Sequence, residues 1–265
     1  MNKKTLVWVS VVSCTVCACD NDPGAGKPTA EVSDALQNPS EAPNAPETVN
    51  EAVKNAVLTD RAASQLFVFD NQNSDLHFVG AKVTGKHEGD FKRFHGEIAV
   101  PSGDLARGAV QATVQMGSVE ADEEKLTMHL KSSDFFDAEK YPEAKFVSTK
   151  VGVTPGDATG THRITGNLSL HGVTKQISFP ATITVSEARI NVDSTFVLNR
   201  QDFGITYPGL PDDTIKDEVA LTLKLQAEVP KSAQADRNAN ATDPSLSSPP
   251  PTIGQTGDRE PGFAQ

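Results

Sequence analysis

A strict alternation of apolar and polar side chains restricts the fold of this chain more than any other feature of its sequence. The longest run is apolar at Val219, Leu221, Leu223, Leu225, Ala227 and Val229, and the positions between them are mostly polar. Successive side chains of a β-strand point to opposite faces, so this period of two predicts a strand with one buried face. Residues 110–116, 177–185 and 190–198 repeat the pattern, which indicates a chain built mainly from half-buried strands.

Eight strands are predicted in the central part of the chain. They span residues 76–84, 91–101, 110–116, 145–153, 161–171, 177–185, 190–198 and 219–229. Pro180 has no backbone N–H to donate to a neighbouring strand, which predicts an edge or a bulge in its strand. An antiparallel series with one buried face must pack as two sheets or close on itself, and alternation does not distinguish these. We favour an all-β, antiparallel eight-stranded barrel, whose interior is wide enough for side chains or for one apolar ligand, as in lipocalins.

One stretch, residues 122–140, departs from the alternation. Leu126 and Leu130 fall on one face of a predicted short helix, and the acidic residues at its start suit the helix dipole. Phe135 and Phe136 follow, and Pro142 biases the chain back towards an extended strand. We therefore expect one short helical crossover that covers an end of the barrel. Its two phenylalanines either plug that end as core or contact a ligand directly.

Composition divides the chain into one folded domain and two tails. Residues 66–230 carry the alternating pattern and are numerous enough for one sizeable core. Residues 20–65 and 231–265 are rich in Pro, Ala, Ser and Asn, and they are predicted to be disordered. A coil of the length of 20–65 would extend roughly 40 Å and hold the domain clear of a membrane surface. Apolar residues at helical spacing between 49 and 57 predict a short amphipathic helix within this linker.

Residues 1–19 have the three parts of a secretory signal peptide. Lys3 and Lys4 precede an apolar stretch that is too short to span a bilayer as a helix. The segment ends in Val16-Cys17-Ala18-Cys19, which resembles a bacterial lipobox, in which the last cysteine is acylated and becomes the mature N-terminus. We predict lipidation at Cys19, with Cys14 as the alternative, because Val11-Val12-Ser13-Cys14 also fits. The domain would then lie on the periplasmic side of a bacterial cell envelope, anchored to a membrane that the sequence does not specify.

Charge and motif content argue against several classes of function. The formal net charge of −11 would repel a phosphate backbone, and no Lys- or Arg-rich run indicates a nucleic-acid interface. All three cysteines lie within the first 19 residues, so no disulfide can hold the folded domain. None of the six histidines has a second ligand at helical spacing, and no hydrolase, nucleotide-binding or metalloprotease motif occurs. We therefore expect no catalytic residue, no metal site, no cofactor and no enzymatic activity.

Five sequence motifs follow one another along the folded domain. They read DFKRFHG at 90–96, HLKSSDFF at 129–136, YPEAKF at 141–146, ITGNLSLHGVTK at 164–175 and DFGI at 202–205. In order and spacing they resemble the YceI-like, polyisoprenoid-binding family of bacterial secreted proteins, over essentially the whole of 66–230. The resemblance implies a lipocalin-like barrel that holds a long isoprenoid or another amphiphile in an apolar tunnel, without catalysis.

An apolar barrel interior would suit such a ligand, because each methylene removed from water contributes about 0.8 kcal/mol. The small inward residues Ala112, Ala181, Ser194 and Ala227 indicate space for it. The residues predicted to line the tunnel or its lid are Phe78, Phe91, Phe94, Val114, Met116, Leu126, Leu130, Phe135, Phe136, Phe146, Phe179, Phe196, Leu221 and Leu223.

Two functions fit these expectations. The first is a membrane-tethered protein that binds a long-chain isoprenoid or a similar lipid, for transport, storage or sequestration. Its partners would be the lipid ligand and, through the N-terminal anchor, the membrane. The alternative is a non-catalytic interaction module of the envelope in which the barrel is only a scaffold. No nucleic-acid partner is expected, and a homodimer is left open.

Overall fold

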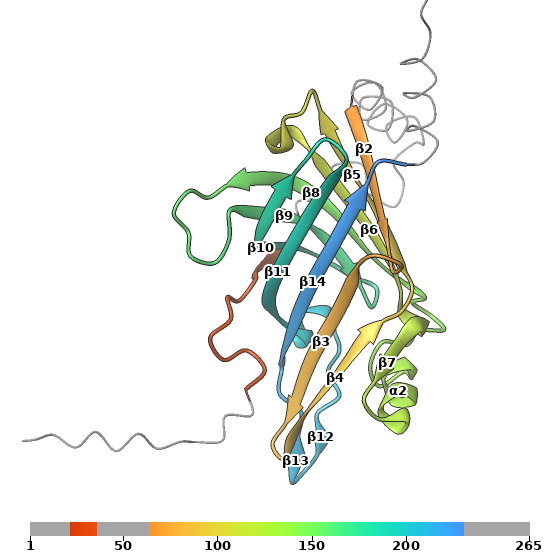
Figure 1. Ribbon diagram of the computed structural model, residues 1–265. Coiled ribbons are helices and arrows are strands. Elements are labelled where there is room, and N and C mark those ends of the chain that lie inside the picture. The colour runs from red at the N-terminus through yellow and green to blue at the C-terminus, as the bar shows by residue number, and fades with distance from the viewer. Residues whose placement is uncertain (1–21, 36–63, 231–265) are drawn as a thin grey trace, which may run out of the picture. The chain divides into compact units, whose positions relative to one another are not determined.

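The computed structural model describes residues 22–35 and 64–230 (Figure 1). The predicted signal peptide and lipidation sites, the short helix at 49–57 and the tail at 231–265 lie outside the described residues. The boundary between compact units of the chain falls between Val229 and Pro230. The folded domain belongs to the unit that ends at Val229.

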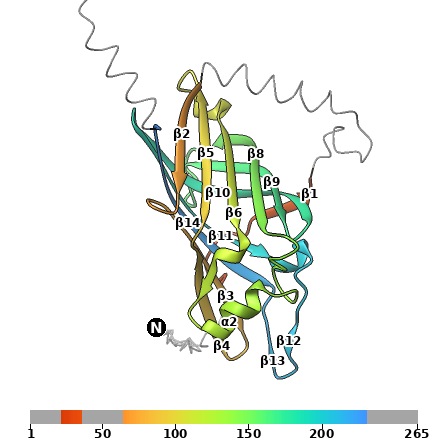
Figure 2. The ribbon, with the colours of Figure 1, turned by 90° about the vertical axis from the view of Figure 1, so that its right-hand side faces the viewer.

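An antiparallel barrel of eight strands forms the body of this unit (Figures 1 and 2). Its wall contains β2 (Ser64–Asp70), β5 (Phe94–Pro101), β6 (Ala109–Gln115), β8 (Glu143–Val153), β9 (His162–Leu170), β10 (Val173–Val185), β11 (Arg189–Asn199) and β14 (Glu218–Glu228). Each strand pairs with the next in this order, and β14 returns to β2 through the pair Glu228 and Val68. The sheet therefore closes on itself, which confirms the predicted barrel over the alternative of two packed sheets.

Further elements extend the wall at one end of the barrel. Strand β3 (Asp75–Lys82) pairs with β14 beyond β2, β4 (Gly85–Phe91) pairs with β3, and β7 (Val119–Ala121) pairs with β4. The helix α2 (Glu124–Lys131) and the hairpin of β12 (Gly209–Leu210) and β13 (Asp213–Thr214) lie at the same end in both views (Figures 1 and 2). We call this the vestibule end. Short 3-10 helices at Leu105–Arg107, Met116–Ser118 and Arg200–Phe203 join strands.

The eight predicted strands are all present, but β3 extends the wall outside the closed ring, in which β2 takes its place. Strands β2, β4, β7, β12 and β13 were not predicted, nor was β1 (Glu31–Asp34). In β2, Leu66, Phe67, Val68 and Phe69 are apolar on both faces, so no alternation is visible. In β4 a glycine stands where an inward apolar side chain would be expected. A Cβ added to Gly89 would lie 2.7 Å from Cζ of Phe78, so the absence of a side chain lets this aromatic ring lie against the strand.

The prediction of a disordered linker from residue 20 is wrong for residues 22–35. Strand β1 (Glu31–Asp34) pairs antiparallel with the first half of β10, from Lys175 to Ser178. The same segment reaches β11, because the amide of Ala30 donates to the carbonyl of Val197 and the amide of Val197 donates to the carbonyl of Pro28, both at 2.9 Å. Strands β10 and β11 pair with each other only between residues 182–185 and 190–193. The N-terminal segment therefore occupies the place where they separate and pairs backbone groups that would otherwise lack partners.

Pro180 lies where the second edge of β10 changes partner. Ser178 is the last residue paired with β1, and Thr182 is the first paired with β11. Proline has no backbone N–H, and at position 180 neither β1 nor β11 is paired with β10, so neither needs this donor. The carbonyl of Pro180 accepts a hydrogen bond from Ser194 Oγ at 2.6 Å, so its polar group is satisfied inside the wall.

Replacement of Gly166 by alanine should destabilise the barrel. A Cβ at this position of β9 would lie 2.5 Å from Cζ of Phe146 and 2.5 Å from the carbonyl oxygen of Val147. Overpacking of this kind costs about 1–3 kcal/mol, which chemical denaturation would detect as a lower midpoint. The matched control is Gly152→Ala in β8, where the nearest atoms lie at 3.8 Å. Equal stabilities of the two variants would contradict this packing.

Candidate functional site: a tunnel with two chambers

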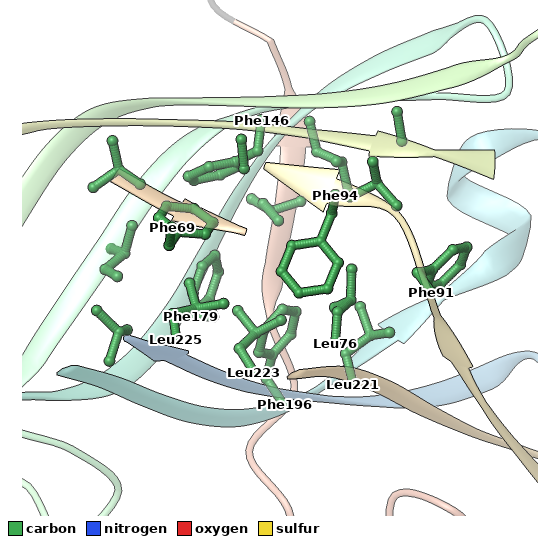
Figure 3. Close-up of a pocket in the computed structure, with 18 of the residues that line it drawn as sticks. Phe69, Leu76, Phe91, Phe94, Phe146, Phe179, Phe196, Leu221, Leu223 and Leu225 are labelled. Carbon is green, nitrogen blue, oxygen red and sulfur yellow. The ribbon is translucent and has the colours of Figure 1, made fainter. Parts of the chain in front are cut away.

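The barrel encloses an inner chamber of about 190 Å³ that is lined only by apolar side chains (Figure 3). Phe179 and Phe196 stack in it, with ring centroids 4.3 Å apart, and Phe146 packs against Phe179 at 5.8 Å. The ring of Phe94 points into the middle of the chamber, opposite the leucines of β14 (Figure 3). Apolar cavities of about 150 Å³ stay dry and take up benzene-sized ligands, so this chamber is suited to a hydrocarbon group and unsuited to water.

A second chamber, the vestibule, lies at the end of the barrel where α2 and the β12–β13 hairpin are found. Its volume is about 460 Å³, and it is lined by both apolar and polar side chains. The two chambers share a boundary formed by Phe91, Phe136, Leu170, Leu198 and Leu221, which line both. The two chambers are therefore adjacent, the inner one apolar and the vestibule mixed in character.

Aromatic side chains follow the boundary between the chambers. The ring of Phe91 lies 5.8 Å from that of Phe78 in the vestibule and 5.8 Å from that of Phe136. Phe136 comes from the turn after α2, and Phe91 ends β4. Aromatic rings at such distances interact favourably, so this row of three rings holds the α2 segment against the barrel.

The α2 segment itself forms a wall of the vestibule. The rings of His129, Phe135 and Tyr207 contact one another, with His129 4.9 Å from each of the other two and Phe135 5.3 Å from Tyr207. The Nε2 atom of His129 lies 2.8 Å from Oδ2 of Asp134. Leu130 and Phe135 are buried beside it. The helical crossover thus forms one side of the vestibule, as expected. Phe135 is packed into this wall and also borders the chamber.

Arg200 stabilises the wall of the vestibule that residues 205–217 form. Its side chain, only 6% exposed, donates to the carbonyl of Ile205 at 2.7 Å, to that of Lys216 at 3.1 Å and to Oδ1 of Asp217 at 3.0 Å. Burial lowers the pKa of the guanidinium, and the carboxylate of Asp217 opposes this shift. One planar cation therefore fixes both ends of the loop from 205 to 217, which carries β12 and β13.

A salt bridge joins the two hairpins of the vestibule end. Lys82 Nζ lies 2.9 Å from Oδ2 of Asp213, and the hydroxyl of Thr84 donates to Oδ1 of the same carboxylate at 2.9 Å. The hydrogen bond from Lys82 lowers the pKa of Asp213, against the opposing effect of desolvation. This contact keeps the β3–β4 turn beside the β12–β13 hairpin at neutral pH.

Each residue predicted to line the tunnel borders a chamber. Phe94, Val114, Met116, Phe146, Phe179, Phe196 and Leu223 line the inner chamber; Phe78, Leu126, Leu130 and Phe135 line the vestibule; Phe91, Phe136 and Leu221 line both. That these residues contact a ligand stays a prediction. Of the small inward residues, Ala112 lines the inner chamber, whereas Ala181, Ser194 and Ala227 are buried.

The sequence analysis missed the polar side chains of the vestibule. These are Lys82, His87, Glu123, Lys125, His129, Asn199, Arg200, Asp213 and Lys216. Lys125 and His129 lie on α2, His87 lies within β4, and the others come from turns, a short 3-10 helix and the ends of strands, so no common alternation marks them. Only His129 lies in a motif that drew attention. In residues 22–35 and 64–230, no three His, Cys, Asp or Glu side chains gather as a metal site. Within the same residues, no helix is long and apolar enough to cross a membrane.

A closed antiparallel barrel with an apolar chamber and a polar mouth defines a lipocalin-like fold. The sequence profile of the YceI-like domain matches residues 67–227, and the chain belongs to this family. A UPF0312 protein of Pseudomonas putida is 34% identical over 139 residues, which cover 50% of this chain and 71% of that protein. A UPF0312 protein of Pseudomonas fluorescens is 35% identical over 168 residues, covering 58% and 83% of the two chains.

Two solved structures share the fold. BcnA of Burkholderia cenocepacia is 24% identical, with a TM-score of 0.53 over 60% of this chain and 98% of that one. A polyisoprenoid binding domain from Saccharophagus degradans, implicated in plant cell wall breakdown, is 19% identical, with a TM-score of 0.50 over 63% and 99% of the two chains. At these identities the likeness concerns the fold alone.

Replacement of Arg200 by lysine should loosen the vestibule and spare the inner barrel. Lysine keeps the charge but cannot serve the separate acceptors that the guanidinium reaches, and each buried acceptor left unpaired costs about 1–3 kcal/mol. Hydrogen exchange should quicken in residues 205–217 and change little in β14. Arg189→Lys is the control, because Arg189 forms an exposed pair with Glu228 and such pairs contribute little. Uniformly faster exchange across the domain would contradict a local role for Arg200.

Proposed function

We propose that this protein binds a long-chain isoprenoid or a similar amphiphilic lipid, with its hydrocarbon chain in the inner chamber and its polar end in the vestibule. The observation that carries the proposal is the change in character between two adjacent chambers, from one lined only by apolar side chains to one that includes lysine, histidine and arginine. An amphiphile has the same change along its length. A soluble polar substrate would leave the inner chamber unfilled.

The size of the chambers supports a chain rather than a compact apolar molecule. The inner chamber alone holds a short hydrocarbon group, and a longer chain would pass the shared boundary at Phe91, Phe136 and Leu221 to reach the vestibule. Each methylene transferred from water contributes about 0.8 kcal/mol before the cost of ordering, so a longer chain gains more than a short one. The Saccharophagus degradans domain, described as polyisoprenoid binding, shares this fold.

Binding, rather than catalysis, is the activity that we propose. The YceI-like barrel is a binding-protein fold. Two of the polar side chains of the vestibule, Lys82 and Asp213, pair with each other, and His129 pairs with the neighbouring Asp134. These contacts shape the mouth of the tunnel and suit the recognition of a polar head.

The lipid content of the full chain, produced with its own N-terminal segment, tests this function. Native mass spectrometry after mild detergent extraction should show a bound amphiphile, which solvent extraction would identify. Ala112→Leu adds hydrocarbon to the inner chamber and should lower lipid occupancy or favour shorter chains. Gln111→Leu changes the neighbouring exposed residue of β6 and should leave the bound lipid unchanged.

A chamber that stays empty under every expression condition would contradict the proposal and favour the alternative of an envelope interaction module. If Ala112→Leu left the bound lipid unchanged, the lipid would lie outside the inner chamber, and the proposed position of its hydrocarbon chain would be wrong. The midpoint of thermal unfolding of both variants shows whether Ala112→Leu fills the chamber or disrupts the fold. Filling an apolar cavity does not by itself lower this midpoint.

We further propose that acylation of Cys19 tethers the protein to a membrane on the periplasmic side of the cell envelope. The lipobox-like Val16-Cys17-Ala18-Cys19 supports this proposal. Cys19→Ser should move the protein from the membrane fraction to the soluble fraction, because a signal peptide alone gives no acyl anchor. Cys14→Ser should leave it in the membrane fraction. The opposite result would assign the modification to Cys14.

A further inference from the structure

The N-terminal segment runs along the outside of the wall towards the vestibule end. Lys86 Nζ donates to the carbonyl of Asp22 at 3.2 Å, and Lys86 is paired with Ala81, which lines the vestibule. Pro23 is fully buried, and a Cβ added to Gly24 would lie 3.2 Å from a methyl group of Val197. Residues 22–24 are therefore packed against the barrel close to the tunnel mouth.

This packing leaves very little chain between the proposed anchor and the barrel. Asp22 is the third residue after Cys19. Three residues span at most about 10 Å when fully extended. An acyl chain on Cys19 would therefore hold Lys86 and the β3–β4 turn within a short distance of the bilayer, in contrast to the loose linker that composition alone predicts.

The rim of the vestibule carries exposed apolar side chains. We define the rim as residues 82–87, 123–131 and 209–216. Val83 is 58% exposed at the β3–β4 turn, Met128 is 60% exposed on α2, and Leu210 is 64% exposed on the β12–β13 hairpin. All three elements lie at the same end of the barrel in Figures 1 and 2. Apolar tips around the mouth of an apolar tunnel are suited to the boundary between headgroups and acyl chains.

The charge of the rim also differs from that of the whole chain. The rim carries five lysines, Lys82, Lys86, Lys125, Lys131 and Lys216, and four carboxylates, Glu123, Glu124, Asp212 and Asp213. Its formal charge is thus close to neutral, whereas that of the chain is −11. Approach of this end to a bacterial phospholipid surface therefore meets less electrostatic repulsion than the net charge of the whole chain implies.

We propose that the built-in N-terminal segment docks the vestibule end onto the phospholipid bilayer that holds the anchor, so that the tunnel opens at the lipid surface. The inference rests on the lipid anchor proposed above. Three apolar tips bind a bilayer weakly on their own, but a short tether raises their effective concentration to about millimolar. An amphiphile could then pass between bilayer and tunnel with its chain shielded from water.

Environment-sensitive labels at the two ends of the barrel test this orientation. Val83→Cys places a label on the rim, and Val185→Cys places a matched label at the far end, where Val185 is 54% exposed. The far end is defined by the hydrogen bond from Gln65 to the carbonyl of Glu187 and by the pair of Arg189 with Glu228. In the acylated mature protein, each introduced cysteine would be the single free thiol, because all natural cysteines lie within residues 1–19.

The acylated full chain is reconstituted on vesicles of phosphatidylethanolamine and phosphatidylglycerol. Collisional quenching by aqueous iodide should be several-fold lower at position 83 than at position 185, with a blue-shifted emission at position 83 alone. A flexible Gly-Ser insertion between Asp20 and Asn21 lengthens the tether without changing the barrel. It should raise quenching at position 83 towards that at position 185, while sedimentation with vesicles and the bound lipid stay the same.

The possible failures are distinguishable. Sedimenting protein with equal quenching at both positions would overturn the docking and leave the anchor in place. Protein that stays in the supernatant would overturn the anchor and the docking together, without affecting lipid binding in the tunnel. Protection of position 83 that persists with the lengthened tether would overturn the role of the N-terminal segment in setting the orientation.

Discussion

The closure of the sheet through β14 is the constraint on which the rest of this structure depends. One edge of β14 pairs with β11 along its whole length, and its other edge is divided between β2 and β3. Because the backbone groups of the wall are paired in this way, the inward apolar side chains can surround a cavity without burying unpaired amides or carbonyls. The division of one edge between two strands also widens the wall at one end. The vestibule forms there, where β3, β4 and β7 continue the sheet.

Glycines make the chamber compatible with its aromatic lining. The ring of Phe146 lies over Gly166 and that of Phe78 lies over Gly89, at distances that leave no room for a Cβ. Rings that lie this close to the backbone of the wall leave part of the lumen open. A larger residue at either glycine would push its ring inward and fill the space that a ligand needs. The cavity therefore depends on aromatic residues and glycines that contact each other across neighbouring strands, not on small residues alone.

The sequence predicts the fold wherever inward and outward positions differ in polarity. This condition holds for the run from Val219 to Val229, and it fails for β2, which is apolar on both faces, and for β4, where glycine replaces an inward side chain. The apolar lining follows from the same alternation, so each predicted residue borders a chamber. The polar mouth could not be predicted, because Arg200 and Lys82 are brought together by turns whose arrangement only the closed barrel determines.

The N-terminal segment shows why composition is an unreliable guide at the edge of a sheet. Residues 22–35 have few bulky apolar side chains, and on that basis they resemble a coil. Their order comes instead from backbone hydrogen bonds to β10 and β11 and from the burial of Pro23 and Ala30. A segment that is held by backbone hydrogen bonds has a fixed direction as well as a fixed place. Antiparallel pairing with β10 determines which end of the segment lies nearer to the vestibule. A tether joined to the barrel in this way can transmit an orientation, which a flexible linker of the same composition could not.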